Sequence, residues 1–263
     1  MEKDNLDIQA EQIADLIIAA KRIVVFTGAG ISTESGIPDF RGKDGIWTKL
    51  DPEDFTIQRF VSSRDVRKMQ WKMLQEGGLV KEVKPNAAHD AVAELEKLGK
   101  LDCVITQNID NLHQLAGNSP DIVFELHGNM QFVRCLKCHK RFPMEEIIAR
   151  LAVEEVPECE HCQGMLKPDA VFFGEALPQW VLNEATKRAS QCDLCIVIGS
   201  TLIVYPAAYI PMYAVEGGAI LVIINMGETP MDPRARVRVD AKAGDVMSKV
   251  MDKVRKKIGR QPN

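Results

Sequence analysis

Four of the seven cysteines form two pairs with the spacing of a thiolate metal site. Cys135 and Cys138 make one Cys-x-x-Cys pair, and Cys159 and Cys162 make the second. Two such pairs can hold one Zn²⁺ in a closed tetrahedral site, which leaves no open position for catalysis. The spacing therefore predicts one structural Zn²⁺.

The other cysteines are not part of these pairs. Cys195 lies within an apolar run and Cys192 at its start, while Cys103 begins another apolar run. Because free cysteine is among the most buried residue types, we expect all three to be core residues. A redox role for Cys192 and Cys195 is the alternative.

A glycine-rich segment directly follows the apolar run 22–27. It begins with Gly28, Ala29 and Gly30, and a glycine there lets backbone N–H groups approach a phosphate closely. The dinucleotide fingerprint of ordinary dehydrogenases requires a third glycine where this chain has Thr33. The segment is therefore a candidate phosphate loop without being a dehydrogenase signature, and a plain tight turn is the alternative.

The glycine-rich segment continues to Gly42 and is dense in hydroxyl side chains. Such a loop contributes little to a core, so we expect a bound molecule to fix its conformation. Phe40 can cover a flat aromatic ring, and Arg41 can pair with a phosphate.

Polar residues also follow two other predicted strands. Asn108 and Asp110 come just after the run 103–105, and His127 follows the run 123–126. Histidine titrates near neutral pH, which suits a general base. The alternatives are an Asx-rich turn for the first pair and a structural role for His127. Residues at the ends of parallel strands open onto the ligand crevice, which favours function.

The elements that position these residues follow from the hydrophobic pattern. Short, β-rich apolar runs predict buried strands at 22–27, 103–105, 194–198 and 219–224. Helical spacing of apolar residues predicts helices near 13–20, 87–98 and 246–258. Asn86 can cap the second helix and Gly99 can end it. Strands alternating with helices predict an α/β fold with a Rossmann-like, doubly wound parallel sheet.

Two stretches interrupt this alternation, residues 43–85 and 131–167. The first has aromatic residues at loose helical spacing, and the second holds the cysteine pairs and little else that is apolar. We expect both to be insertions that form a small domain, one helical and one a zinc ribbon. The large domain then comprises residues 1–42, 86–130 and 168–263.

The overall composition excludes several classes of protein. The 263 residues include 33 Lys and Arg against 37 Asp and Glu, too little positive charge for a strongly basic nucleic-acid or anionic-membrane binder. The N-terminus is acidic without an apolar signal segment, and no apolar run approaches the roughly 20 residues of a bilayer span. We expect a cytoplasmic protein that binds neither membranes nor nucleic acid directly.

Taken together, these motifs resemble the sirtuin family of NAD-dependent protein lysine deacylases. The run from Gly28 to Gly42 is similar to the family's first NAD-binding motif almost letter for letter. The other matching segments follow in the family's order: Gln107–Asp110, His127–Gly128, the two cysteine pairs, Val171–Glu175, Gly199–Leu202, Asn225–Thr229 and Gly244–Val246.

The resemblance implies a reaction. In this family, the carbonyl oxygen of an acyl-lysine attacks the ribose carbon that carries nicotinamide, and the products are nicotinamide, free lysine and 2′-O-acyl-ADP-ribose. By resemblance, His127 is the catalytic base that takes a proton from a ribose hydroxyl. Asp110 is expected to accept from the nicotinamide carboxamide, and Asn108 to hold a ribose hydroxyl or a water molecule.

The resemblance also implies the remaining contacts. NAD, as co-substrate, is expected to contact Gly28, Ala29, Gly30, Thr33, Phe40, Arg41, Gln107, Asn108, Ile109, Asp110, Gly199, Ser200, Asn225 and Val246. An acyl-lysine protein or peptide is expected to bind as an extended strand against Val171, Phe173, Gly174, Glu175 and Val204. Many family members have Gly-Thr-Ser where this chain has Gly199-Ser200-Thr201, and Ser200 still supplies a donor.

The expected acyl preference comes from two positions at which this chain differs from some members of the family. Sirtuins that prefer succinyl- or malonyl-lysine carry a Tyr and an Arg three residues apart, where this chain has Met69 and Lys72. We therefore expect a preference for neutral acyl groups such as acetyl.

Two other functions remain open. A mono-ADP-ribosyltransferase would use the same activated ribose with a different acceptor. A non-enzymatic zinc-ribbon adaptor would need only the cysteines. Retention of His127, Asn108 and Asp110 speaks against the adaptor, which has no use for them.

Overall fold

Six parallel strands form the larger of two β-sheets in this computed structural model, which describes residues 2–40, 42, 45–77 and 83–259. In spatial order they are β3 (Val123–Glu125), β2 (Leu101–Thr106), β1 (Ile23–Thr27), β7 (Leu194–Ile198), β8 (Ile220–Ile224) and β9 (Val237–Val239). β1 and β7 are buried along their whole length, and every residue in them except Thr27 is apolar. Such strands require cover on both faces of the sheet.

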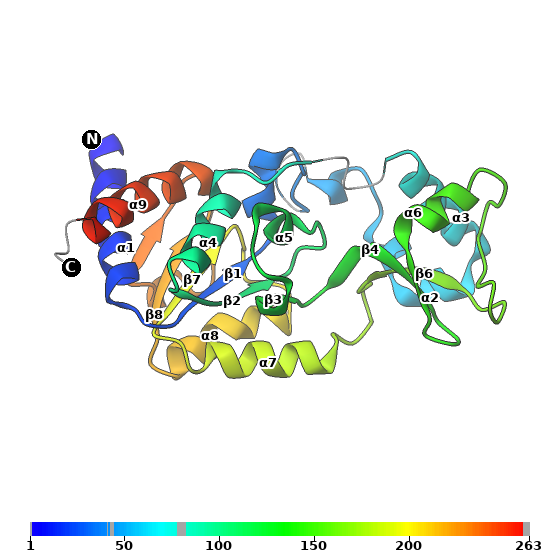
Figure 1. Ribbon diagram of the computed structural model, residues 1–263. Helices are drawn as coiled ribbons and strands as arrows, with labels where there is room; N and C mark the ends of the chain where they lie inside the picture. Colours follow the sequence, from blue (N-terminus) through cyan, green and yellow to red (C-terminus); the bar gives the residue numbers. More distant parts are fainter. Residues whose placement is uncertain (1, 41, 43–44, 78–82, 260–263) are drawn as a thin grey trace.

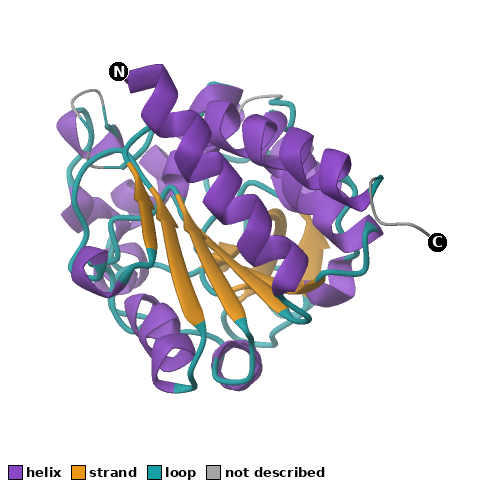
Figure 2. Ribbon diagram, turned by 90° about the vertical axis from the view of Figure 1, so that its left-hand side faces the viewer, coloured by secondary structure: helices purple, strands orange, loops and turns teal. Residues whose placement is uncertain are grey.

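Helices supply this cover on both faces (Figure 2). One face packs against α1 (Glu2–Ala19), α4 (Ala87–Lys97) and α9 (Ala243–Ile258). The other face packs against α7 (Gln179–Ala189) and α8 (Ile210–Glu216). In the described ranges, no helix has both the length and the apolar character needed to cross a membrane. The arrangement confirms the predicted doubly wound α/β fold.

The predicted ends of α4 are confirmed. The Asn86 Oδ1 accepts a hydrogen bond from the backbone N–H of Ala88 at 2.9 Å, and His89 Nδ1 accepts from the backbone N–H of Asn86 at 3.3 Å. Gly99 follows the helix with a φ of +66°, in the left-handed region that glycine favours. Local sequence therefore fixes both ends of this helix.

The direction of the strand order changes between β1 and β7. From β1 the chain continues to β2 and β3 on one side, and it later returns to β7 on the other side. At such a point the connections diverge to opposite faces, and the carboxyl edge of the sheet opens into a crevice. The short helix α5 (Leu112–Ala116) follows β2 at this edge.

A three-stranded antiparallel sheet and three helices lie at the end of the molecule away from both termini (Figure 1). The elements are β4 (Gly128–Cys135), β5 (Arg141–Pro143), β6 (Leu166–Ala170), α2 (Ile57–Ser62), α3 (Arg64–Gln75) and α6 (Met144–Arg150). Trp71 of α3 packs in one core cluster with Val133 and Ile147, so the two interrupting segments share a core. This sheet extends slightly beyond residues 131–167, because Gly128 pairs with Ala170.

Trp71→Ala tests this shared core. The Trp71 side chain is fully buried, whereas that of Trp180 is 70% exposed. We expect Trp71→Ala to lower the free energy of unfolding by about 3–5 kcal/mol, and the control Trp180→Ala to change it by less than about 1 kcal/mol. Chemical denaturation of both variants measures the difference, and equal effects would contradict the assignment of Trp71 to the core.

Candidate active site

Two cavities open at the carboxyl edge of the parallel sheet. The first, of about 270 Å³, has mainly apolar walls, and the second, of about 570 Å³, is lined by the glycine-containing loops. Both are lined by Ala29, Phe40, Gln107, Asn108, His127 and Val204. The cavities therefore meet, and the cleft can hold a polar and an apolar ligand with their ends in contact near His127.

The loops after β1 and β7 pack backbone against backbone. Gly30 donates its N–H to the carbonyl oxygen of Gly199 at 2.8 Å. A Cβ on Gly30 would lie 2.7 Å from the Cα of Gly199, and a Cβ on Gly199 would lie 2.1 Å from the nitrogen of Ile31. Glycine is thus required here for contact between the two loops, in addition to the phosphate access expected from the sequence.

His127 lies between β3 and β4, where the two cavities meet. Its Nδ1 is 2.8 Å from the carbonyl oxygen of Gln107, so Nδ1 carries the proton and Nε2 keeps a free lone pair. Burial lowers the pKa of His127 below its ordinary value of 6.5, opposed by the hydrogen bond to Gln107. The imidazole is therefore neutral at pH 7 and can accept a proton at Nε2.

Ser32, Asn108 and Asp110 form a buried, hydrogen-bonded group in the wall of the first cavity. The Ser32 Oγ donates to Asp110 Oδ2 at 2.7 Å and accepts from Asn108 Nδ2 at 3.1 Å. The other carboxylate oxygen of Asp110 accepts from the backbone N–H of Leu112 at 3.0 Å. Sequence reasoning missed Ser32, whose signal was the density of hydroxyl side chains in the loop 28–42.

A second buried polar layer holds the start of the loop after β2. The Thr106 Oγ1 accepts from Thr27 Oγ1 at 2.8 Å and from the backbone N–H of Asn108 at 3.0 Å, while Thr27 Oγ1 lies 3.0 Å from His113 Nε2. Burial lowers the pKa of His113 to about 3 and that of His89 to about 4. Both imidazole rings are therefore neutral at pH 7. The centroids of the His89 and His113 rings lie 5.1 Å apart.

Aromatic side chains build much of the apolar wall of the first cavity. The centroid of the Trp47 ring lies 5.4 Å from that of Phe55 and 5.6 Å from that of Phe173. The backbone of Phe173 also pairs with this wall, because its N–H donates to Phe55 O at 3.1 Å and its carbonyl accepts from Ile57 N at 3.0 Å. All five predicted peptide-binding residues line this cavity: Val171, Phe173, Gly174, Glu175 and Val204.

The segment Val171–Glu175 is fixed by the buried ammonium group of Lys167. The Lys167 Nζ is 3.0 Å from Glu175 Oε2, 2.6 Å from the carbonyl oxygen of Ala170, and 4.2 Å from the centroid of the Phe172 ring. Burial lowers the pKa of Lys167, and the Glu175 carboxylate opposes this shift. Sequence reasoning did not single out Lys167, since a lone lysine carries no signal of burial.

The second cavity brings together most residues predicted to contact NAD: Gly28, Ala29, Gly30, Thr33, Phe40, Gln107, Asn108, Gly199, Ser200 and Asn225. Ile109 and Asp110 line the first cavity instead. Val246 is fully buried, and the wall near it is formed by Ala241, Lys242 and Ala243. Arg41 lies outside the described residues.

The two cysteine pairs come together beside the small sheet. Their four Sγ atoms all lie within 4.8 Å of one another, and all four cysteines are free of disulfides. The backbone N–H groups of Lys137 and Cys138 lie 3.4 and 3.5 Å from Cys135 Sγ, which favours a thiolate. The group fits a tetrahedral Zn²⁺ with bonds of about 2.3 Å.

The remaining cysteines lie in the core, as predicted. Cys103, Cys192 and Cys195 are buried, and burial raises the pKa of each thiol. Thiols in such surroundings are unreactive at neutral pH. The core interpretation is therefore confirmed.

Cys159→Ser tests the zinc site. We expect the purified wild-type protein to contain one Zn²⁺ per chain and the variant to lose it, with a lower thermal midpoint, because a serine hydroxyl is a poor zinc ligand. Elemental analysis measures the metal. Cys192→Ser is the matched control, since a serine can keep the hydrogen bond from Cys192 Sγ to Ala189 O, at 3.1 Å. Full occupancy in Cys159→Ser would refute the assignment.

Proteins of named activity are similar to this chain over almost its whole length. The NAD-dependent protein deacylase 2 of Archaeoglobus fulgidus is 43% identical over 253 residues, which covers 95% of this chain and 98% of the relative. The NAD-dependent protein deacetylase of Thermotoga maritima is 42% identical over 250 residues, which covers 93% of this chain and 98% of the relative.

Solved structures show the same likeness. A structure described as the basis for the mechanism and regulation of Sir2 enzymes has a TM-score of 0.87 at 42% identity, covering 95% of this chain and 99% of its own. A complex of Sir2 with a p53 peptide and NAD⁺ has a TM-score of 0.81 at 40% identity, and the match covers 92% of this chain and 96% of the solved chain. Residues 28–206 match the model of the Sir2 family. The chain therefore belongs to the Sir2 family, the sirtuins.

Proposed function

We propose that this chain is an NAD-dependent protein lysine deacylase that acts on neutral acyl groups, acetyl foremost. The observation that carries the proposal is His127, a neutral imidazole with a free Nε2 at the meeting point of a polar and an apolar cavity. NAD occupies the second cavity, and its nicotinamide end reaches Asp110 in the wall of the first cavity, which the acyl-lysine enters. The named activities of the relatives and the Sir2 complex with peptide and NAD⁺ support this proposal.

In the proposed reaction, the acyl carbonyl oxygen displaces nicotinamide at the ribose carbon of NAD. His127 then removes the proton from a ribose hydroxyl, and that hydroxyl attacks the new intermediate. Because Nδ1 donates to Gln107, Nε2 is the atom that accepts this proton. Water completes the reaction, and the products are nicotinamide, free lysine and 2′-O-acyl-ADP-ribose.

Asn108 and Asp110 are proposed to hold the nicotinamide end of NAD. Each Asp110 oxygen accepts one hydrogen bond, from Ser32 or Leu112, and keeps capacity to accept another from the nicotinamide carboxamide. The Asn108 Nδ2 is engaged with Ser32, so its Oδ1 is left to accept from a ribose hydroxyl or water. Ser32 thereby orients both groups.

The other proposed contacts run along the second cavity. The loops at Gly28 and Gly199 take the phosphates, Gln107 contacts the nicotinamide ribose, and Asn225 contacts the adenosine ribose. The roles of Arg41 and Val246 remain predictions, as do the cytoplasmic location and the lack of direct nucleic-acid binding. We also propose the domain division stated above, supported by the core that Trp71 shares between the two insertions.

The charge of the first cavity supports the choice of a neutral acyl group. Its described lining residues include no lysine or arginine but do include the carboxylates of Asp110 and Glu175. A succinyl carboxylate would therefore be buried without a cationic partner. Met69 and Lys72 do not line this cavity, whereas Gln70 and Met73 of the same helix do.

Acyl-lysine peptides test the proposed function. With NAD, we expect acetyl-lysine peptide to lose its acetyl group as nicotinamide appears, and succinyl-lysine peptide to react at least about tenfold more slowly, since an unpaired buried carboxylate is costly. Mass spectrometry follows both peptides and the enzyme. Faster turnover of the succinyl peptide would contradict the acyl preference. Transfer of ADP-ribose to protein would favour the mono-ADP-ribosyltransferase. The absence of any reaction with NAD would favour the non-enzymatic adaptor.

His127→Ala tests the proposed base. We expect deacylation to fall by about 10²- to 10⁴-fold, with zinc content and thermal midpoint unchanged. In the wild type, burial lowers the pKa of His127, so the acid limb of kcat/KM, where the imidazole becomes protonated, should have its midpoint below pH 6.5. Near-normal turnover in His127→Ala, or an acid limb above that pH, would refute the assignment.

A further inference from the structure

We propose that Arg238 is a positioning residue for the dinucleotide. Through the carbonyl group of Gly227, it fixes the carboxamide of Asn225 so that Asn225 offers only a hydrogen-bond acceptor to the second cavity. This inference rests on the proposed function, because it takes the ligand of that cavity to be NAD and the partner of Asn225 to be the adenosine ribose. It assigns a role to a residue that lines neither cavity.

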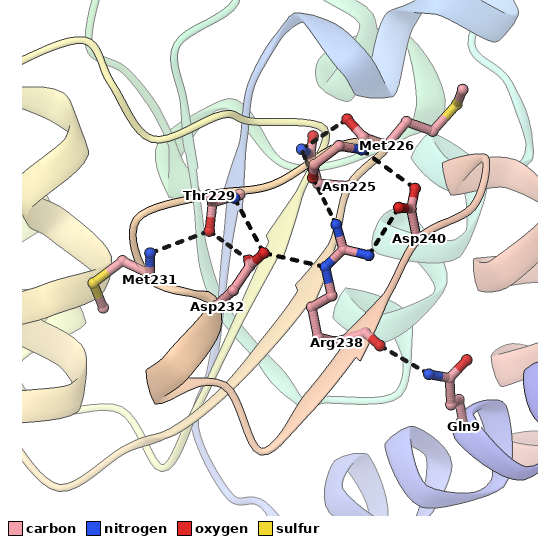
Figure 3. Close-up of polar contacts among 9 residues, drawn as sticks. Gln9, Asn225, Met226, Thr229, Met231, Asp232, Arg238 and Asp240 are labelled. Atoms are coloured by element: carbon pink, nitrogen blue, oxygen red, sulfur yellow. Dashed lines mark hydrogen bonds and ion pairs between the residues drawn. The ribbon is translucent and has the colours of Figure 1, made fainter.

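Arg238 is anchored on both sides by carboxylates (Figure 3). Its Nε is 3.3 Å from Asp232 Oδ2, and its Nη1 is 3.1 Å from Asp240 Oδ2. The side chain is only 25% exposed, so these ion pairs are partly shielded from solvent. A guanidinium held at two of its nitrogens has a fixed orientation, so the position of its third nitrogen, Nη2, is fixed as well.

That third nitrogen reaches the loop after β8. Arg238 Nη2 donates to the carbonyl oxygen of Gly227 at 2.7 Å. The same oxygen accepts from Asn225 Nδ2 at 2.9 Å, so Arg238 and Asn225 share one acceptor. The backbone N–H of Gly227 donates to Asp240 at 3.3 Å. Both polar groups of the Gly227 backbone are thus held by the Arg238–Asp240 pair.

The far end of the loop is held as well. The Asp232 carboxylate accepts from Thr229 Oγ1 at 2.7 Å and from the backbone N–H of Thr229 at 3.2 Å. Strand β9, which carries Arg238, is fixed to β8 by pairing and to α1 by a hydrogen bond of 2.8 Å from Gln9 Nε2 to Arg238 O. Arg238 therefore links the loop to the rigid sheet.

These contacts fix the orientation of the Asn225 carboxamide. Its Nδ2 donates to the carbonyl oxygens of Met226 at 3.0 Å and Gly227 at 2.9 Å, which uses both amide hydrogens. Its Oδ1 accepts no hydrogen bond from the described residues, and Asn225 lines the second cavity. A hydroxyl of the ribose can donate to this oxygen. We assign this donor to the 2′-hydroxyl of the adenosine ribose, because NADP has a phosphate in its place and that phosphate offers acceptor oxygens. The 3′-hydroxyl is common to NAD and NADP and does not distinguish them.

Binding of NAD and NADP to the zinc-loaded protein tests the role of Arg238. In Arg238→Met, the carbonyl group of Gly227 loses its link to strand β9, so the carboxamide of Asn225 is held less firmly and can rotate to present its NH₂ group. We expect the Kd for NAD to rise about fivefold, the scale of losing one neutral hydrogen bond, and the Kd for NADP to change less than about twofold. Calorimetry measures both. Arg236→Met is the matched control, since Arg236 is exposed and forms no ion pair with a described residue.

A second variant separates positioning from general damage. If Arg238 acts through Asn225, the double variant Arg238→Met with Asn225→Ala should bind NAD no more weakly than Asn225→Ala alone. The KM for acetyl-lysine peptide should stay unchanged in Arg238→Met. Equal weakening of NAD and NADP, additive effects in the double variant, or the same effect in Arg236→Met would overturn the proposal.

Two further measurements keep the test decisive. If Arg238→Met lacks a cooperative thermal transition, the variant Arg238→Lys is used in its place. Lysine keeps the positive charge but cannot bridge both carboxylates and Gly227. We expect the same selective rise in the Kd for NAD. If the wild type binds NAD without deacylating any peptide, the proposed function fails while the role of Arg238 remains testable by binding.

Discussion

The site depends on the close packing of two loops at the change in strand direction. The loops after β1 and β7 touch through Gly30 and Gly199, where a Cβ on either residue would clash with the other loop's backbone. This contact holds the two loops together at the carboxyl edge, where both line the second cavity. Residues after β2, β3 and β8 then reach the same cleft because all six strands are parallel and end at one edge.

The cleft is polar at its centre, and hydrogen bonds offset the cost of burying these groups. His127 is held through Nδ1 by a backbone carbonyl, which leaves Nε2 as its acceptor. Ser32 links Asn108 to Asp110, so Asn108 keeps its Oδ1 for a ligand, and each Asp110 oxygen, which already accepts one hydrogen bond, can accept a second. Asn225, held through Gly227, keeps its Oδ1 in the same way at the other end of the cleft.

The sequence predicted the scaffold and most of the candidate site. The apolar runs, the Asn86 cap and the cysteine spacing each depend on neighbours in the chain, so they can be read locally. Ser32, Lys167 and Arg238 could not be found this way. The partner of Ser32 is Asp110, 78 residues away. Lys167 and Arg238 have partners nearby in sequence, but nothing in the local pattern shows that the Lys167 ammonium group is buried or that Arg238 reaches the carbonyl oxygen of Gly227. The backbone contact expected at Val246 stays a prediction, because its side chain is buried and the described cavity wall is formed by residues 241–243.

By itself, the sequence determined the parallel α/β sheet, the cysteine ligands and the identity of the polar residues that follow the strands, because burial periodicity and ligand spacing are properties of short segments. Only the tertiary structure decided how these residues act together. The tautomer of His127, the two-part cleft and the acceptor-only face of Asn225 all depend on hydrogen bonds and packing between different segments. Such contacts exist only once the chain has folded.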